Sequence, residues 1–187
     1  MNASEDYSRY LQGRSRLGLA YRNHWLYPRL NRWLRGRVLD VGCGIGDMLR
    51  FLPSSIGVDV NAVNVSLCRD AGLAAEVMAP DVLPFDNANF DSVILDNVLE
   101  HIEEPGPLLA EIRRVLVDGG VFVVGVPGER GYAADPDHKQ FYDRARLEKT
   151  IVEAGFVLDR LRGMPLDCDA LSPRMTQFCI YGAFRRA

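Results

Sequence analysis

A glycine-rich turn is the first part of the sequence whose residue types suggest chemistry. Gly42, Gly44 and Gly46 occupy alternate positions at the end of a predicted buried strand, Val38–Cys43, and just beyond it. Glycine has no Cβ, so this backbone can turn tightly and a ligand can lie directly against it. Asp47 follows at the start of the next predicted helix, where a carboxylate would repel a pyrophosphate. The spacing is GxGxG rather than the GxGxxG of dinucleotide sites, so the turn is a poor match to a dinucleotide site.

Two further carboxylates end the second and third predicted strands. Asp59 lies in the apolar run 55–60, and Asp81 follows the weaker run 75–79. In an open α/β sheet these strand ends meet beside the first turn, where Asp59 can accept hydrogen bonds from both hydroxyls of a ribose. Asp81 can accept a hydrogen bond from an adenine amino group while the apolar residues of 82–85 flank the ring. The alternative is that each acid caps a helix, but together they predict an adenosine site without a phosphate cradle.

The elements that must position these residues alternate between strand and helix. We expect strands at 38–43, 55–60, 75–79, 90–96, 121–126, 156–162 and 176–184, and helices at 47–52, 61–71, 105–116 and 144–154. Gly119 and Gly120 are expected to end the helix at 105–116. Buried strands in alternation with helices predict a doubly wound parallel sheet covered on both faces. The last two strands have no helix between them, which predicts a seven-stranded α/β sheet that is mostly parallel with one antiparallel strand.

The N-terminal segment differs from this body in composition. Residues 7–34 hold both tryptophans and an imperfect helical spacing of apolar residues, which Pro28 is expected to break or kink and Gly36 to end. We therefore divide the chain into an N-terminal helical lid or arm at 1–36 and a globular domain at 37–187. The arm is rich in arginine, and this charge is either a solvated helix face or a contact with an anionic substrate or partner. Its apolar residues either pack on the domain edge or close over the ligand.

Composition excludes several classes of protein. The formal net charge of −3 gives no general attraction to nucleic acid or to an anionic membrane. No run approaches the ~20 apolar residues of a membrane span, and we do not expect the polar N-terminus to act as a signal peptide. The cysteines, Cys43, Cys68, Cys168 and Cys179, show no CxxC spacing, which argues against a zinc site and a disulfide framework. We expect a cytoplasmic protein with reduced thiols and no metal site.

Several short motifs in this order resemble class I S-adenosylmethionine-dependent methyltransferases, in particular the small bacterial group called type 11. They are Val38–Gly46, Gly57–Asp59, Asp81–Phe85, Phe90–Val93, Asn97–Ile102, and Glu111–Leu116 followed by Gly119 and Gly120. The resemblance covers residues 37–156 and implies a Rossmann-like fold with S-adenosylmethionine as cofactor and S-adenosylhomocysteine as product.

The resemblance also implies which residues bind the cofactor. They are Asp40, Gly42, Cys43, Gly44, Asp59, Val60, Asp81, Val82 and Asn97. Asp59 would bind the ribose, with Val60 against the adenine. Asp81 would hold the adenine edge, the Asn97 carbonyl would approach the ammonium, and Asp40 would order the turn.

Candidate catalytic residues are fewer. Methyl transfer from a sulfonium is an in-line displacement, so positioning and exclusion of water can supply most of the rate, and a base is needed only for a protonated acceptor of high pKa. His138 precedes the last predicted helix in a segment similar to one of this family, and it is our candidate base or acceptor contact. Tyr142 is the second candidate, as a pocket residue. His101 is expected to have a structural or cofactor-edge role, and His24 to lie on the lid surface.

We therefore predict an S-adenosylmethionine-dependent methyltransferase that acts on an oxygen or nitrogen atom, ahead of carbon, of a small molecule. The phrase after the fourth strand, Asp96–Leu99, lacks the Pro-Pro-aromatic pattern of enzymes that methylate the exocyclic amines of bases, so no nucleic-acid partner is expected. The alternatives are a non-catalytic cofactor-binding module or partner subunit and, behind it, an NAD(P)-binding reductase. The acceptor and the oligomeric state do not follow from the sequence.

Overall fold

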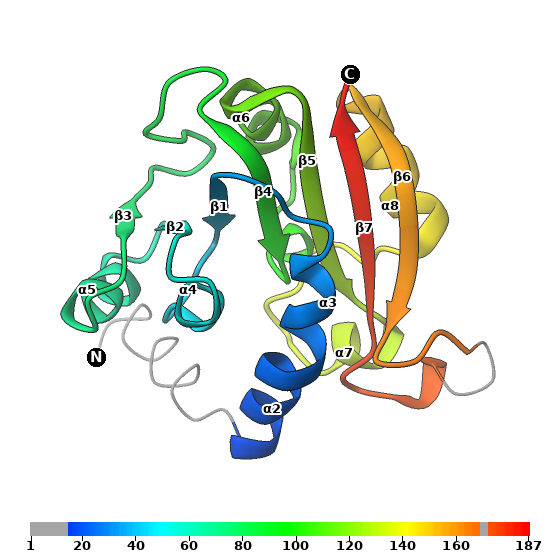
Figure 1. The fold of residues 1–187 in the computed structure, drawn as a ribbon. Coiled ribbons are helices and arrows are strands. Elements are labelled where there is room, and N and C mark those ends of the chain that lie inside the picture. Colours follow the sequence, from blue (N-terminus) through cyan, green and yellow to red (C-terminus); the bar gives the residue numbers. More distant parts are fainter. Residues whose placement is uncertain (1–14, 169–171) are drawn as a thin grey trace.

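The computed structural model describes residues 15–168 and 172–187, and it places a single seven-stranded sheet between helices (Figure 1). The strands are β1 (Val38–Val41), β2 (Ile56–Asp59), β3 (Ala75–Val77), β4 (Phe90–Asp96), β5 (Leu116–Pro127), β6 (Phe156–Met164) and β7 (Cys179–Arg186). The helices are α2 (Arg16–Tyr21), α3 (Tyr27–Asn31), α4 (Asp47–Phe51), α5 (Ala62–Asp70), α6 (Gly106–Val115), α7 (Glu129–Ala133) and α8 (Arg144–Glu153). Three shorter turns complete the described elements: the π-helical η1 (Arg22–Leu26) and the 3₁₀ turns η2 (Leu99–His101) and η3 (Ser172–Arg174). The part of the predicted arm at 1–14 lies outside the described residues.

The sheet has the order β3-β2-β1-β4-β5-β7-β6. β7 runs antiparallel to both of its neighbours, and the other adjacent strands run parallel. This confirms the predicted seven-stranded, doubly wound sheet with one antiparallel strand. The strand order reverses between β1 and β4, and in open α/β sheets the crevice at such a point, beyond the carboxyl ends of the strands, is where ligands bind.

Each face of the sheet carries its own core because β1, β4 and β5 are buried on both sides. On one face, α6 and α8 pack their apolar residues against the sheet, with Ile112 and Ile151 fully buried. On the other face, Leu30 of α3 and Met48 of α4 pack against Ile94 and its neighbours. None of the described helices is both long enough and apolar enough to cross a membrane.

The predicted helix 105–116 matches α6 within one residue at each end, but the terminating role given to Gly119 and Gly120 was wrong. The helix ends at Val115 and β5 begins at Leu116, so Gly119 and Gly120 lie inside the strand rather than terminating the helix. Along β5 the paired residue changes from Leu116 directly to Val121, whereas its partner on β4 advances only from Phe90 to Ser92. The start of β5 is therefore irregular and bulged. Gly119 has a φ of +67°, a conformation that glycine adopts readily.

Pro28 does not break the N-terminal helical segment. α2, η1 and α3 follow one another without interruption, and the residues at both junctions keep right-handed helical dihedral angles. Pro28 lies in the first turn of α3, directly after the π-helical turn in which the Tyr27 N–H donates to the Arg22 carbonyl. The segment ends at Asn31, before the predicted stop at Gly36.

The segment that joins α3 to β1 is fastened to the start of β4. Ser92 is fully buried, and its hydroxyl accepts a hydrogen bond from the Arg35 N–H (2.8 Å) and donates one to the Arg35 carbonyl (2.9 Å). The neighbouring Asp91 accepts a hydrogen bond from the Arg37 N–H at 2.8 Å. These contacts set how the N-terminal helices approach the sheet.

We expect Ser92→Ala to lower the free energy of unfolding by about 1–3 kcal/mol, because both backbone groups of Arg35 lose their partner. Urea unfolding measures this change, and Ser66→Ala on the exposed side of α5 is the matched control, with an expected effect within about 0.5 kcal/mol. Equal stability of the two variants would contradict the fastening role.

Candidate functional site

The turn after β1 is held in place by the neighbouring strand β2. The N–H groups of Gly42 and Cys43 both donate to the Val58 carbonyl, at 2.8 and 3.0 Å. Gly42 has a φ of +75°, and a Cβ at this position would lie 2.4 Å from Cγ2 of Val98. The turn therefore requires glycine both for its backbone conformation and for the space that it leaves.

Asp59 closes the same turn from the end of β2. One carboxylate oxygen accepts a hydrogen bond from the Gly44 N–H and the other accepts one from the Asn61 N–H, each at 2.8 Å. Burial raises the pKa of Asp59, while the hydrogen bonds from Asn61 and Gly44 oppose this rise. The carboxylate thus orders the backbone of the turn and still has lone pairs available for a ligand.

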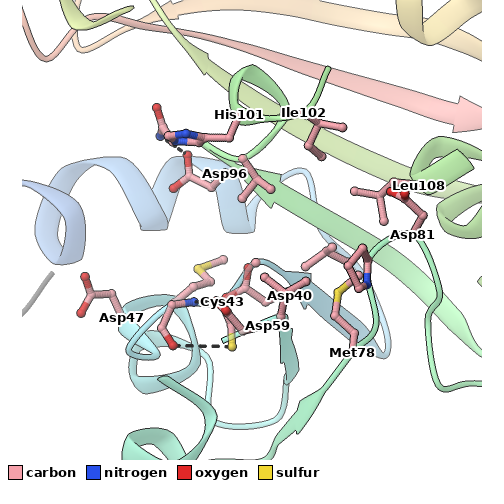
Figure 2. A pocket seen from close by; sticks show the side chains of 18 of the residues that line it. Asp40, Cys43, Asp47, Asp59, Met78, Asp81, Asp96, His101, Ile102 and Leu108 are labelled. Carbon is pink, nitrogen blue, oxygen red and sulfur yellow. Dashed lines mark hydrogen bonds between the residues drawn. The ribbon is translucent and has the colours of Figure 1, made fainter. Parts of the chain in front are cut away.

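A cavity of about 670 Å³ opens above this turn, at the carboxyl ends of β1, β2 and β4. Eight of the nine predicted cofactor residues line it: Asp40, Gly42, Cys43, Gly44, Asp59, Val60, Asp81 and Asn97. The ninth, Val82, is 55% exposed and is not among the lining residues. Figure 2 shows Asp59 and Cys43 on one side of the cavity, with Asp96 and His101 on the opposite side. The structure thus brings together residues from four separate predicted motifs.

The lining of this cavity is strongly acidic. The acidic residues among the lining are Asp40, Asp47, Asp59, Asp81, Asp96, Glu103 and Glu104. Among the described lining residues, Arg22 is the one arginine or lysine. The negative electrostatic potential of these side chains disfavours phosphates and favours a ligand that carries positive charge.

Asp40 is the most buried of these acids, with 4% of its surface exposed. Burial raises the pKa of its carboxyl well above the usual value, and the charges of Asp96 and Asp59 raise it further. A buried carboxyl without a nearby cation costs folding free energy when it ionises, so a ligand that brings positive charge would be favoured beside it.

A polar network lies across the cavity from Asp59. Asp96 accepts hydrogen bonds from the Tyr181 hydroxyl (2.8 Å) and the Asn97 side-chain amide (2.7 Å), and it pairs with Arg22 at 3.5 Å. Arg22 also donates to the Tyr27 hydroxyl at 3.3 Å. The network therefore joins β4, β7 and the N-terminal helices.

On the far side of this network is a second cavity of about 390 Å³. Arg22, Asn97 and His101 line both cavities, so the two spaces meet at these side chains. The second cavity also contains Glu100 and the predicted catalytic residue His138. Burial raises the pKa of Glu100 to about 8.

Tyr142, the other predicted catalytic residue, lies in the main core. It is 1% exposed and lines neither cavity. Its hydroxyl has no hydrogen-bond partner among the described residues. His24 is exposed on η1, as expected. His101 lies at the edge of the first cavity, although its exposure to the second cavity was not expected.

The sequence analysis did not single out Arg22, Tyr181 or Asp96 of the network between the cavities, although Asn97 and His101, which line both cavities, were among its candidates. Arg22 was one of several arginines in the arm, and Tyr181 was one position in a predicted strand. Asp96 had a recognisable signal, because it ends the fourth predicted strand, 90–96, as Asp59 ends the second. The pairing partners of Asp96 come from 74 and 85 residues away in the chain, which no local pattern records.

Comparison with known proteins gives the family context. A family model described as a methyltransferase domain matches residues 39–124. A probable S-adenosylmethionine-dependent methyltransferase of Mycolicibacterium smegmatis is 30% identical over 166 residues, covering 79% of this chain and 65% of the relative. The chain spans 47–65% of the length of the first three curated relatives that it matches.

Two solved structures that share this fold are described as proteins with different activities. One, from Thermotoga maritima, is described as an S-adenosylmethionine-dependent methyltransferase, possible histamine N-methyltransferase; it is 17% identical, with a TM-score of 0.77 over 100% of both chains. The other is the [4+2]-cyclase SpnF, 20% identical, with a TM-score of 0.70 over 86% of this chain and 80% of that one. At these identities the likeness concerns the fold alone.

The raised pKa of Asp40 leads to a prediction about pH. An acid whose folded pKa is raised binds more protons folded than unfolded, so stability falls as pH rises from its ordinary value of 3.8 to its folded pKa. We expect Asp40→Asn, which cannot ionise, to gain stability relative to the natural chain as pH rises from 4 to 8. Urea unfolding across this range measures the difference, and Asp70→Asn at the exposed end of α5 corrects for the lost charge. A difference that shrinks with rising pH would contradict the burial of an ionisable Asp40.

Proposed function

We propose that this chain is a class I S-adenosylmethionine-dependent methyltransferase that transfers the cofactor's methyl group to an oxygen or nitrogen atom of a small-molecule acceptor. The single observation that carries the proposal is the pair of cavities that meet at Arg22, Asn97 and His101. One has the charge and size expected for the cofactor, and the other has space for an acceptor beside it.

The first cavity fits S-adenosylmethionine. Its volume lies within the range of small-molecule sites, about 300–1,000 Å³. The open backbone at Gly42 and Gly44 allows close approach, and Asp59 keeps lone pairs that can accept the ribose hydroxyls. The acidic lining suits a ligand with a sulfonium and an ammonium group. It opposes the pyrophosphate of NAD(P), which argues against the reductase alternative.

The second cavity supports a small acceptor. Its 390 Å³ is bounded by α2, α7 and the start of β7, and in Figure 1 these elements gather beyond one end of the sheet. Tyr21 and Leu26 give it an apolar wall, while Glu100 and His138 give it a polar one. We propose that the N-terminal helices act as the wall of the acceptor site, which is the lid role expected of the arm.

Methyl transfer requires little from the protein beyond holding the cofactor and the acceptor in position. Bound S-adenosylmethionine supplies an electrophilic methyl group whose reactivity comes from the positive sulfur. The network of Asp96, Arg22 and Tyr181 would fix the boundary between the cavities, and the N-terminal helices would exclude water. His138 remains our candidate for contact with the acceptor.

A non-catalytic module is the second candidate function. The fold also serves a protein described as a [4+2]-cyclase rather than as a methyltransferase, so the fold and methyl transfer are separable. Direct measurement of turnover separates the two candidates.

We expect Asp59→Ala to weaken binding of S-adenosylhomocysteine by about 1–3 kcal/mol, because a charge-assisted hydrogen bond to the ribose is lost together with the support of the Gly44 N–H. Isothermal titration calorimetry measures the affinity, and circular dichroism checks that the variant is folded. Glu76→Ala, an exposed acid on β3 outside the cavity lining, is the control. Unchanged affinity in folded Asp59→Ala would remove Asp59 from the cofactor site.

We also expect the natural chain to form S-adenosylhomocysteine faster when small amines or hydroxyl compounds are added to labelled cofactor. Gly42→Ala should abolish this turnover, because the added Cβ would collide with Val98 and distort the turn. Tight cofactor binding without turnover on any acceptor of such a set would favour the non-catalytic module.

A further inference from the structure

Three potential metal ligands converge in the wall of the second cavity. They are Glu100 and His101, which are adjacent in η2, and His138, which follows α7. One ligand atom from each lies within 4.8 Å of the others. The cluster brings together two parts of the chain that are 37 residues apart, so sequence spacing alone did not reveal it.

The orientation of His138 is set by its backbone partner. Its Nδ1 lies 2.8 Å from the Tyr132 carbonyl oxygen. A carbonyl can only accept, so Nδ1 carries the hydrogen and the neutral ring has its lone pair on Nε2. This arrangement, with one ring nitrogen donating to a backbone carbonyl, is the usual way in which proteins orient a metal-binding histidine.

The Nε2 atom points toward a carboxylate that has no other partner. Nε2 lies 3.8 Å from Oε1 of Glu100, and the Glu100 side chain is 1% exposed. Neither oxygen of Glu100 accepts a hydrogen bond from any residue that the structure describes. A buried carboxylate and an imidazole lone pair that face each other repel unless a proton or a metal ion lies between them.

His101 completes the set from the other side. Its ring centroid lies 4.6 Å from that of His138, and it lines both cavities. Two imidazole nitrogens and one carboxylate oxygen form a donor set that suits zinc and other first-row metals rather than magnesium or calcium. Bonds of about 2.1 Å place tetrahedral ligands roughly 3.4 Å apart, so side-chain movements of about 1 Å would close the set.

We propose that Glu100, His101 and His138 bind one divalent first-row transition-metal ion, with its open coordination positions toward the second cavity. The binding itself does not depend on methyl transfer. If the proposed function holds, the ion would lie where an acceptor oxygen or nitrogen could coordinate it, and His138 would then be a ligand rather than a free base.

The test titrates the untagged, metal-free protein with Zn²⁺ by calorimetry and with Co²⁺ by visible absorption. We expect one ion per chain with low-micromolar or tighter affinity, and an absorption spectrum of cobalt with nitrogen and oxygen ligands. Glu100→Gln and His138→Gln should each weaken binding at least ~10-fold, because each removes a direct ligand. His24→Gln, which changes an exposed histidine outside the cluster, should leave the affinity unchanged.

Two variants on different elements keep the test decisive if one of them fails to fold. Absence of binding at micromolar concentrations would overturn the proposal and leave a shared proton between Glu100 and His138. Binding that neither substitution weakens, or a cobalt–thiolate absorption band, would place the metal elsewhere and also overturn it. Because no methyl acceptor enters the measurement, its outcome is independent of whether the chain catalyses methyl transfer.

Discussion

The hydrogen bonds that join the turn after β1 to β2 are the interactions on which the shape of the first cavity depends. The Val58 carbonyl receives two N–H groups of the turn, and the Asp59 carboxylate receives a third from Gly44. Without these bonds, a run of glycines would be among the most mobile parts of the chain, since each can adopt many backbone conformations. The parallel pairing of β1 with β2 therefore converts a flexible sequence into a fixed surface. The acids of the lining then give that surface its charge.

Much of the fold follows from local patterns in the sequence. The run 90–96 is apolar enough to be recognised as a strand, and it is found with the same bounds as β4. α5 lies within the predicted helix at 61–71, because the Asn61 side-chain cap and the left-handed Gly72 that bound it act within one helical turn. The mistake at Gly119 and Gly120 has the same origin. Those glycines follow a helix in the sequence, and only the pairing with β4 shows that they belong to a bulged strand.

The two cavities of the candidate site differ in the same way in how far the sequence predicts them. The predicted cofactor residues lie at strand ends, and the rule that ligands bind where the strand order reverses is enough to bring them together. The second cavity has no such rule behind it. Arg22, His138 and Tyr181 come from three distant segments, and their meeting depends on how the N-terminal helices, the loop after α7 and β7 pack. For the same reason, the cluster of Glu100 with two histidines became visible only in three dimensions.

The chain order of the two cavities has a consequence for biosynthesis. All lining residues of the cofactor cavity fall between positions 22 and 108, whereas the second cavity needs residues 176–181, just before and within β7. A ribosome therefore completes the residues of the first cavity about 70 codons before those of the second. A nascent chain therefore has every residue needed to line the first cavity while the start of β7, which the second cavity also requires, is still to be synthesised. Cofactor present during translation would then stabilise β1, β2 and β4, the strands whose carboxyl ends line the first cavity.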